Sequence, residues 1–193
     1  MNWEIAVTLA ITIFLAFAGY IATYVNNQKN AQRKAQIDRV NEQLKEFYGP
    51  LHSLGLASES AWVSFQYTHK PAGHRLSGEF WAPSEPPSVE EGEAWRLWMK
   101  TVFMPLNLRM VEIVTTRADL MEETVLPNCL GQLTAHVYSY AAVLKAWEQG
   151  DYSRHTAVSN FPGPELLSYS QEMYKKIKEK QATLLGGNGD PNK

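Results

Sequence analysis

The sequence predicts an all-α protein in which one N-terminal transmembrane helix runs into a cytoplasmic bundle of four to five helices. Residues 5–25 contain no charged side chain, and a helix of that length spans roughly 31 Å, close to the thickness of a bilayer core. Apolar residues after position 37 recur at spacings of three and four, which is typical of helices that pack along one another. No alternation longer than a few residues indicates a β-strand.

We divide the 193 residues into a transmembrane anchor over 1–25, a juxtamembrane helix over 26–48 that continues into the bundle, a bundle domain over 49–185 and a flexible tail over 186–193. The part after the anchor is long enough for one domain with a core. The net charge of −2 gives no strongly basic face for nucleic acid. The single cysteine, Cys129, excludes an internal disulfide and suits a reducing compartment.

Two interpretations of the N-terminus compete, a cleaved signal peptide and a retained anchor. Residues 16–18, Ala-Phe-Ala, resemble a cleavage site, but no lysine or arginine precedes the apolar run, as a signal peptide requires. The basic residues Lys29, Arg33 and Lys34 all follow the run. We therefore expect a retained single-pass anchor with its N-terminus outside and its C-terminal domain in the cytoplasm.

The membrane interface is expected to involve the aromatic residues that flank this run, together with the basic residues after it. Trp3 stands at one end, and Tyr20 and Tyr24 stand at the other. Aromatic side chains at these positions are typical of interfacial anchors. Whether the first helix is continuous across Asn26-Asn27 stays open, because asparagine is a poor helix former.

The second half of the first helix carries an apolar seam that continues past a glycine and a proline. The seam comprises Ile37, Val40, Leu44, Phe47, Leu51 and Leu54. Pro50 cannot donate a hydrogen bond to the preceding turn, and Gly49 can close one helix where proline opens the next. Because the seam keeps its phase, we expect a kink or a tight break here, and we expect Tyr48, Gly49 and Pro50 to be a hinge or interaction site.

Residues 68–87 contain four prolines and two glycines and are predicted to form a long loop. Phe80 and Trp81 within this loop either contact a partner or attach the loop to the bundle. Ser88 and Glu91 then fit a capping box at the start of the next helix. Pro105 should kink or divide that helix.

Two further helices complete the predicted bundle. The Val114-Thr115-Thr116 stretch is not expected to end the helix that contains Pro105, and Pro127 fits the first position of the next one. The seam of that helix comprises Leu126, Leu130, Leu133, Val137, Tyr140, Leu144 and Trp147. A last helix after Pro164 should bury Leu166, Ser170, Met173 or Tyr174, Ile177 and Leu184.

A search for chemistry finds no catalytic, metal-binding or cofactor-binding motif. His69 and His74 lack a strong ligand spacing, and no nucleophile motif or phosphate-binding loop occurs. His136 adjoins the seam, so we expect it to be either a half-buried group that titrates near neutrality or a histidine paired at the edge of the bundle. Glu112, Asp119, Glu122 and Glu123 are expected to form a solvated helix face.

Three stretches resemble a group of small bacterial membrane-anchored proteins without established activity. They are Leu44-Lys-Glu-Phe-Tyr-Gly-Pro-Leu51, the Trp-x-x-x-x-x-Met-Pro-Leu-Asn stretch at 98–107, and the His-Val-x-x-Tyr-x-x-Val-Leu-x-x-Trp stretch at 136–147. The resemblance carries no catalytic residue. It implies that Phe47, Tyr48, Gly49, Pro50, His136 and Trp147 belong to one structural or recognition unit, and that the protein resides in the bacterial inner membrane.

These observations favour a membrane-tethered interaction or scaffold module, an accessory subunit of a larger assembly. Its expected partners are the bilayer and a protein partner or a second copy, with no nucleic acid and no cofactor. The alternative is a membrane-bound sensor or effector that relays a signal through the first helix. An enzyme that uses the acidic middle of the chain is the less favoured third reading.

Overall fold

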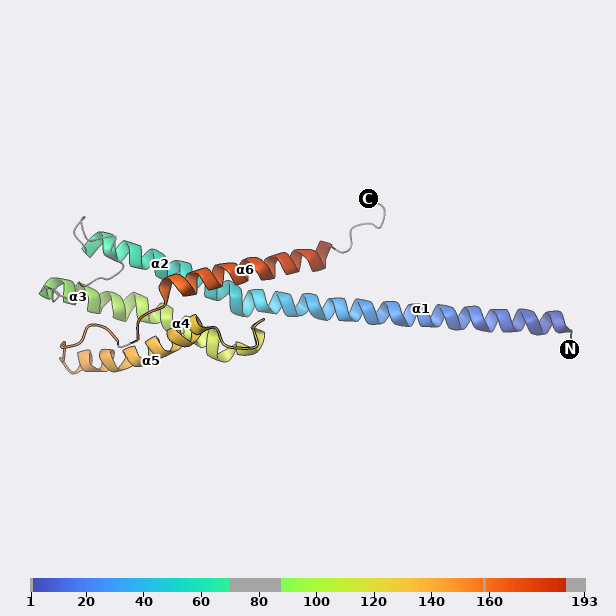
Figure 1. Cartoon of the computed structure of the whole chain (residues 1–193), viewed down its shortest axis with the longest axis horizontal. Coiled ribbons are helices and arrows are strands. Elements are labelled where there is room, and N and C mark those ends of the chain that lie inside the picture. Colours follow the sequence, from blue (N-terminus) through green and yellow to red (C-terminus); the bar gives the residue numbers. More distant parts are fainter. Residues whose placement is uncertain (1, 70–87, 158, 187–193) are drawn as a thin grey trace. The chain divides into compact units, whose positions relative to one another are not determined.

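The computed structural model describes residues 2–69, 88–157 and 159–186, and within these ranges the chain is helical with no strand. Its elements are α1 (Trp3–Glu42), the π-helical turn η1 (Gln43–Tyr48), α2 (Gly49–His69), α3 (Val89–Trp98), the π-helical turn η3 (Met99–Phe103), α4 (Met104–Thr116), the 3₁₀ turn η4 (Ala118–Leu120), α5 (Asn128–Glu148) and α6 (Gly163–Gly186) (Figure 1). The predicted all-helical class is confirmed for this part of the chain.

The chain divides into two compact units, which are described separately. The first comprises residues 1–41 and the end of the chain from residue 180, and the second comprises residues 42–179. Helix α6 contributes to both units, because its last residues belong to the first and the rest to the second.

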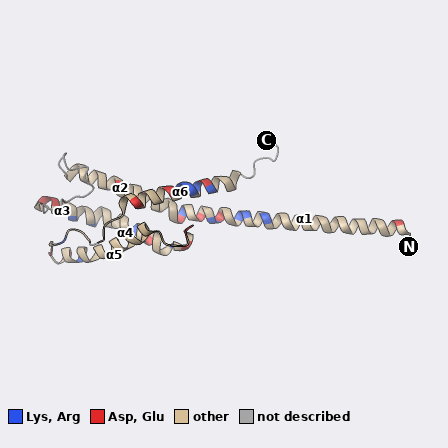
Figure 2. Ribbon diagram, viewed as in Figure 1, with Lys and Arg blue, Asp and Glu red and all other residues tan. Residues whose placement is uncertain are grey.

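The first unit contains the apolar run of α1. Large apolar side chains over residues 5–25 are exposed, and Figure 2 shows that this part of the helix carries no charge. Among the described residues it is the one helix long and apolar enough to cross a membrane. Helix α1 also passes through Asn26 and Asn27 without interruption, because its hydrogen-bonded ladder outweighs the weak helix propensity of two residues.

The core of the second unit is built around α4, which packs against both α2 and α5. The first part of α6 packs on α2, where the Tyr174 ring stacks on His52 with centroids 5.3 Å apart. The largest side chains that are fully buried come from η1, α2, α4, η4, α5 and α6, and they are Phe47, Tyr48, Leu51, Phe65, Met110, Leu120, Leu130, Leu133, Tyr140, Trp147, Leu166 and Ile177. One apolar core therefore joins all these elements.

The predicted capping box is present at the start of α3. The Glu91 backbone N–H donates to Ser88 Oγ (3.2 Å), and the Ser88 N–H donates to Glu91 Oε2 (2.8 Å). Two other predicted boundaries differ. Helix α4 ends at Thr116, because the β-branched pair Thr115-Thr116 adds little helix propensity. Pro127 is the N-cap of α5 and not its first residue.

Most of the predicted seam residues are buried. On α5, Leu130, Leu133, Val137, Tyr140 and Trp147 are buried, whereas Leu126 is 46% exposed since it precedes the helix. On α6, Leu166, Ser170, Met173 and Ile177 are buried. Helical periodicity thus identified the core-facing side of both helices.

Candidate functional site

A buried cluster of hydrogen-bonded polar side chains surrounds η1 in the second unit. Gln43 and Tyr48 lie on η1 and are 1% and 0% exposed. Gln43 Nε2 donates to the Leu120 carbonyl (2.9 Å) and to Glu122 Oε1 (3.0 Å). The Tyr48 hydroxyl accepts from the Glu122 backbone N–H (2.8 Å) and donates to Glu123 Oε2 (3.1 Å). Side chains of η1 therefore hold the segment that follows η4.

Three weakly acidic groups in and around this polar cluster have a raised pKa. Burial raises the pKa of Tyr48, and the nearby Glu123 carboxylate raises it further. Burial also raises the pKa of Tyr169, with added contributions from Tyr48 and Glu123, and it raises the pKa of the Cys129 thiol. All three groups are therefore protonated near neutrality, and a protonated thiol is a poor nucleophile. The cluster can bind and orient, but it holds no activated nucleophile.

Gly49 and Pro50 adjoin the polar cluster, and the structure explains both residues. The Gly49 N–H donates to the Leu44 carbonyl five residues back, which is the hydrogen bond of a π-turn. A Cβ atom on Gly49 would collide with that carbonyl oxygen, so glycine alone fits. The helix does not break at Gly49-Pro50, contrary to one of the two predicted outcomes. The irregularity lies in the preceding π-turn, which accommodates a proline that has no N–H to donate.

His136 lies in a different place and has a structural role. Its Nδ1 is 2.7 Å from the Ser159 carbonyl oxygen, and since a carbonyl can only accept, Nδ1 carries the proton. The ring also contacts Tyr140 and Phe161. Burial lowers the pKa of His136, and the bond to Ser159 opposes this only in part. His136 is therefore a buried histidine that is paired with a backbone carbonyl and neutral at pH 7, which agrees with the second of the two predicted alternatives and not with the first.

Three more rings bind the segment between α5 and α6. Trp95 Nε1 donates to the His155 carbonyl (2.7 Å) and to the Tyr140 hydroxyl (3.0 Å), and that hydroxyl donates to the same carbonyl (2.5 Å). Trp147 Nε1 donates to the Arg154 carbonyl (2.7 Å). Together with His136, these rings donate to the carbonyl groups of Arg154, His155 and Ser159 and so fix the irregular segment that contains them. We call this set, Trp95, His136, Tyr140 and Trp147, the ring clamp.

The residues that the resemblance groups together fall into two sets. Phe47 and Tyr48 are in edge-to-face contact on η1, directly before Gly49 and Pro50. His136 and Trp147 both contact Tyr140 in the ring clamp. Tyr48 bonds to Glu122 and Glu123, whereas His136 bonds to Ser159. The residues of the resemblance therefore belong to two structural sites of the second unit.

Two of the four acidic residues predicted to form a solvated face do not do so. Glu112 is exposed and pairs with Arg109 (2.9 Å), and Asp119 is exposed. Glu122 and Glu123 instead bond to Gln43 and Tyr48 in the polar cluster. The expectation was wrong for Glu122 and Glu123. Helix α4 ends at Thr116, so these two residues do not continue a face of that helix. No sequence signal linked them to Gln43.

No arrangement for metal or nucleophilic chemistry is found in the described ranges. There, no group of three or more His, Cys, Asp or Glu side chains is placed to hold a metal ion. Ser170 Oγ lies 3.5 Å from His52 Nδ1, but Ser170 is fully buried and its hydroxyl donates to the Leu167 carbonyl (3.0 Å). A hydroxyl in that position is inaccessible to a substrate.

In the first unit, the predicted interface residues lie along one helix, α1. Trp3, Tyr20 and Tyr24 are 75%, 67% and 55% exposed, and Lys29 and Lys34 are exposed as well. The two tyrosine rings stack on each other with centroids 6.5 Å apart. Such exposed rings at the end of an apolar run are suited to the headgroup layer of a membrane.

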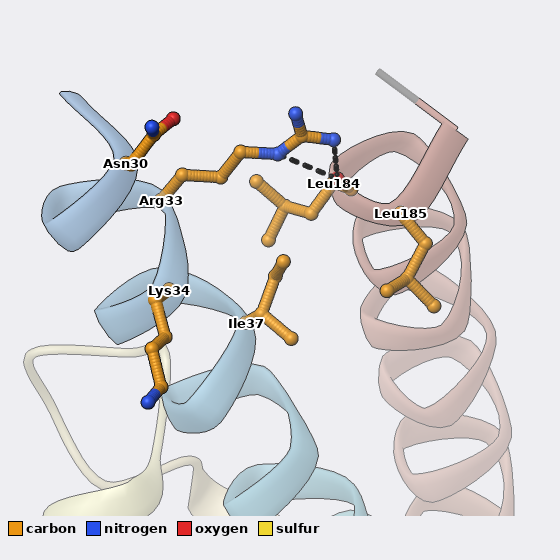
Figure 3. Close-up of a pocket in the computed structure, with 6 residues that line it drawn as sticks. All are labelled: Asn30, Arg33, Lys34, Ile37, Leu184 and Leu185. Carbon is orange, nitrogen blue, oxygen red and sulfur yellow. Dashed lines mark hydrogen bonds between the residues drawn. The ribbon is translucent and has the colours of Figure 1, made fainter. Parts of the chain in front are cut away.

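Arg33 connects α1 to the end of α6 within the first unit. Its Nε and Nη2 both donate to the Leu184 carbonyl oxygen, at 3.1 and 2.5 Å (Figure 3). A shallow pocket lies beside this contact, lined by Asn30, Arg33, Lys34, Ile37, Leu184 and Leu185. A cation at the C-terminal end of a helix satisfies carbonyls that have no partner within the helix. Sequence reasoning placed Arg33 at the interface but did not predict this contact.

Phe80 and Trp81 lie outside the described residues, as does most of the predicted loop. Thr68 and His69, its first two residues, belong to α2. Comparisons of the chain with family models, curated proteins and solved structures find no match. The resemblance to small bacterial membrane-anchored proteins therefore stays an expectation, and the functional argument rests on this molecule alone.

Proposed function

We propose that this protein is a membrane-tethered helical interaction module, an accessory subunit of a larger assembly at the bacterial inner membrane. In this proposal residues 5–25 span the bilayer, with the N-terminus outside and the rest of the chain in the cytoplasm. The exposed apolar run and the basic residues that follow it support the tether. In the described residues, the buried polar side chains form structural hydrogen bonds. An enzyme would need an activated nucleophile, acid or base among them, so the arrangement favours binding over catalysis.

The observation that carries the interaction role is the exposed face of α2. Across its 21 residues this helix has a single Asp, Glu, Lys or Arg side chain, Glu59. Leu56, Val63 and Tyr67 are 46%, 41% and 62% exposed, and their spacing of seven and four places them on one side of the helix. Depletion of charge with exposed apolar and aromatic side chains is typical of the centre of a protein interface.

In-cell photocrosslinking tests this proposal. A photoreactive amino acid at Val63 of the membrane-embedded protein should give one discrete adduct, either with a partner protein or with a second copy. The adduct should disappear when Leu56→Glu places a charge on the same face. A matched probe at the exposed Glu172 of α6 should give none. Equal labelling at both positions, or none at Val63, would refute α2 as the interaction face.

A sensor remains the second candidate, and one feature of the polar cluster favours it. Gln43 Oε1 is buried without a hydrogen-bond partner among the described residues, and π-turns frequently occur at functional sites. A small donor could occupy this position and bias the π-turn. His136 would not move in such a sensor, because its ring is held by the Ser159 carbonyl. Binding of such a ligand should protect the amide hydrogens of η1 from exchange, and unchanged exchange across a ligand panel would count against it.

A further inference from the structure

The end of α6 lies next to the part of α1 that follows the apolar run. Helix α6 runs antiparallel to α1 there, so that its last turn points toward the apolar run (Figure 3). The contacts that hold it include those from Arg33 to the Leu184 carbonyl and from Gln181 Nε2 to Asn41 Oδ1 (2.7 Å). Arg33 is eight residues beyond Val25, so the α6 end lies about 12 Å along the helix from the end of the apolar run.

This distance places the α6 end at the outer edge of a bilayer. The polar headgroup layer extends about 5–8 Å beyond the hydrocarbon core, and electrostatic attraction acts over a further 8 Å or so at physiological ionic strength. Leu185 is 55% exposed and lines the shallow pocket with Leu184. If residues 5–25 span the membrane, an apolar side chain from the far end of the sequence therefore faces the headgroup region.

The charge around the pocket is complementary to anionic lipid. The described residues of the first unit beyond the apolar run include Lys29, Arg33, Lys34, Arg39 and Lys180, with Asp38 as the single acid. The carbonyl groups at the end of α6 would repel an anion, but Arg33 binds the Leu184 carbonyl through two nitrogen atoms and offsets this. Lys29 and Lys34 are exposed on either side of Arg33 along α1.

We infer that the α1–α6 pocket is a docking site for the headgroup of an anionic phospholipid and a second point of membrane contact besides the anchor. Lysine and arginine side chains reach toward the lipid phosphate, and the exposed Leu185 lies beside the outer part of the headgroup layer. Juxtamembrane basic clusters bind anionic lipid in this manner. The inference rests on the proposed membrane tether.

The test uses the full-length chain in lipid nanodiscs, with Leu185→Cys labelled by an environment-sensitive fluorophore. Cys129 is buried, so the fluorophore should react selectively with the introduced cysteine at position 185. Emission should shift to the blue in discs that contain one anionic lipid, phosphatidylglycerol, relative to discs of pure phosphatidylcholine, and high salt should reverse the shift. The Lys29→Gln/Lys34→Gln variant, which keeps the Arg33 contact, should lose the shift. The Lys145→Gln/Lys175→Gln variant, with the same charge change in the second unit, should keep it.

The two proposals fail in different ways. Identical emission in both lipids, from protein that has entered the discs, would overturn the docking site and leave the tether intact. A shift that persists in the Lys29→Gln/Lys34→Gln variant would also overturn it, because the lysines would then have no part in binding. Failure of the chain to enter discs of either composition, together with its release from membranes by alkaline carbonate, would overturn the tether itself.

Discussion

In two helices of the second unit, α2 and α4, the proline near the start of the helix follows a π-turn. In η1 the Gly49 N–H donates to the Leu44 carbonyl, and in η3 the Met104 N–H donates to the Met99 carbonyl. Both bonds reach back five residues, and both donors directly precede a proline, Pro50 or Pro105. The same backbone solution thus arises twice, because a proline leaves the carbonyl groups before it without their usual donor.

The surroundings of the two π-turns differ. Around η1 lies the polar cluster, with Gln43 and Tyr48 hydrogen-bonded to the segment after η4. Around η3 lies an aromatic cluster, in which the Phe103 ring centroid is 5.9 Å from those of Phe65, Trp95 and Trp98. The residue before proline is glycine in the first and a buried methionine in the second. A π-turn therefore demands neither glycine nor a polar setting, and the need for glycine at η1 comes from the close approach of the Leu44 carbonyl to Gly49.

The largest expected effect concerns Gly49. Gly49→Ala forces a methyl group into the Leu44 carbonyl, and we expect a loss of about 3 kcal/mol in the free energy of unfolding. Gly131→Ala is the matched control, because a Cβ there meets only Leu126 Cδ2 at 3.9 Å, and it should be neutral or stabilising by up to about 1 kcal/mol. Chemical denaturation of the detergent-solubilised chain, followed by tryptophan fluorescence, measures both. Equal stability of the two variants would contradict this prediction, because it would mean that the backbone of η1 can shift to accommodate the added methyl group.

The next prediction compares a tyrosine hydroxyl of the polar cluster with one of the ring clamp. Tyr48→Phe leaves the Glu122 N–H and the Glu123 carboxylate without their partner, which should cost about 2–3 kcal/mol. Tyr140→Phe removes the corresponding group of the ring clamp, but Trp95 Nε1 still donates to the His155 carbonyl, so about 1 kcal/mol is expected. Denaturation curves under the same conditions decide the order. A larger loss of unfolding free energy in Tyr140→Phe would contradict this order, because the ring-clamp hydroxyl would then stabilise the fold more than the hydroxyl of the polar cluster.

The sequence predicted the parts of this comparison that depend on local pattern. Helical periodicity identified the buried faces of α5 and α6, and the Ser88 capping box marked the start of α3. Gly49 and Pro50 were recognised as irregular, but a π-turn was not foreseen, because it depends on where the preceding carbonyl groups find donors. The partners of Tyr48 and His136 lie 74 and 23 residues away along the chain. Such contacts follow from tertiary packing, which one sequence without relatives does not reveal.

The third prediction concerns a loss of stability on acidification, which arises from His136 in the ring clamp. Because burial lowers the pKa of His136 in the folded state, the unfolded chain takes up a proton first as the pH falls below about 6.5. The stability is therefore intact above this pH and decreases below it, by at most about 1.4 kcal/mol per pH unit for this group. Burial lowers the pKa of His155 as well, so it adds to the same slope.

Thermal unfolding between pH 5 and 8 measures this slope. His136→Asn keeps a side-chain donor for the Ser159 carbonyl but cannot titrate, so its stability should depend less on pH below 6.5 than that of the unaltered chain. Near pH 8 the two proteins should differ by a constant amount. A slope that is unchanged in His136→Asn would assign the acid sensitivity to other groups and remove His136 from the explanation.

The smallest expected effects concern the prolines themselves. Proline to alanine raises the conformational entropy of the unfolded chain, at a cost of about 0.4–1 kcal/mol, but it also supplies an N–H for a carbonyl in the preceding turn. These contributions oppose each other, so Pro50→Ala and Pro105→Ala should each change stability by less than about 1 kcal/mol. Hydrogen exchange of the Gly49 and Met104 amides reports whether the π-turns persist. If both π-turns persist in the alanine variants, the surrounding packing maintains them, and a hinge at Pro50 is contradicted. If η1 alone becomes regular α-helix, the polar cluster is the site whose backbone can change conformation.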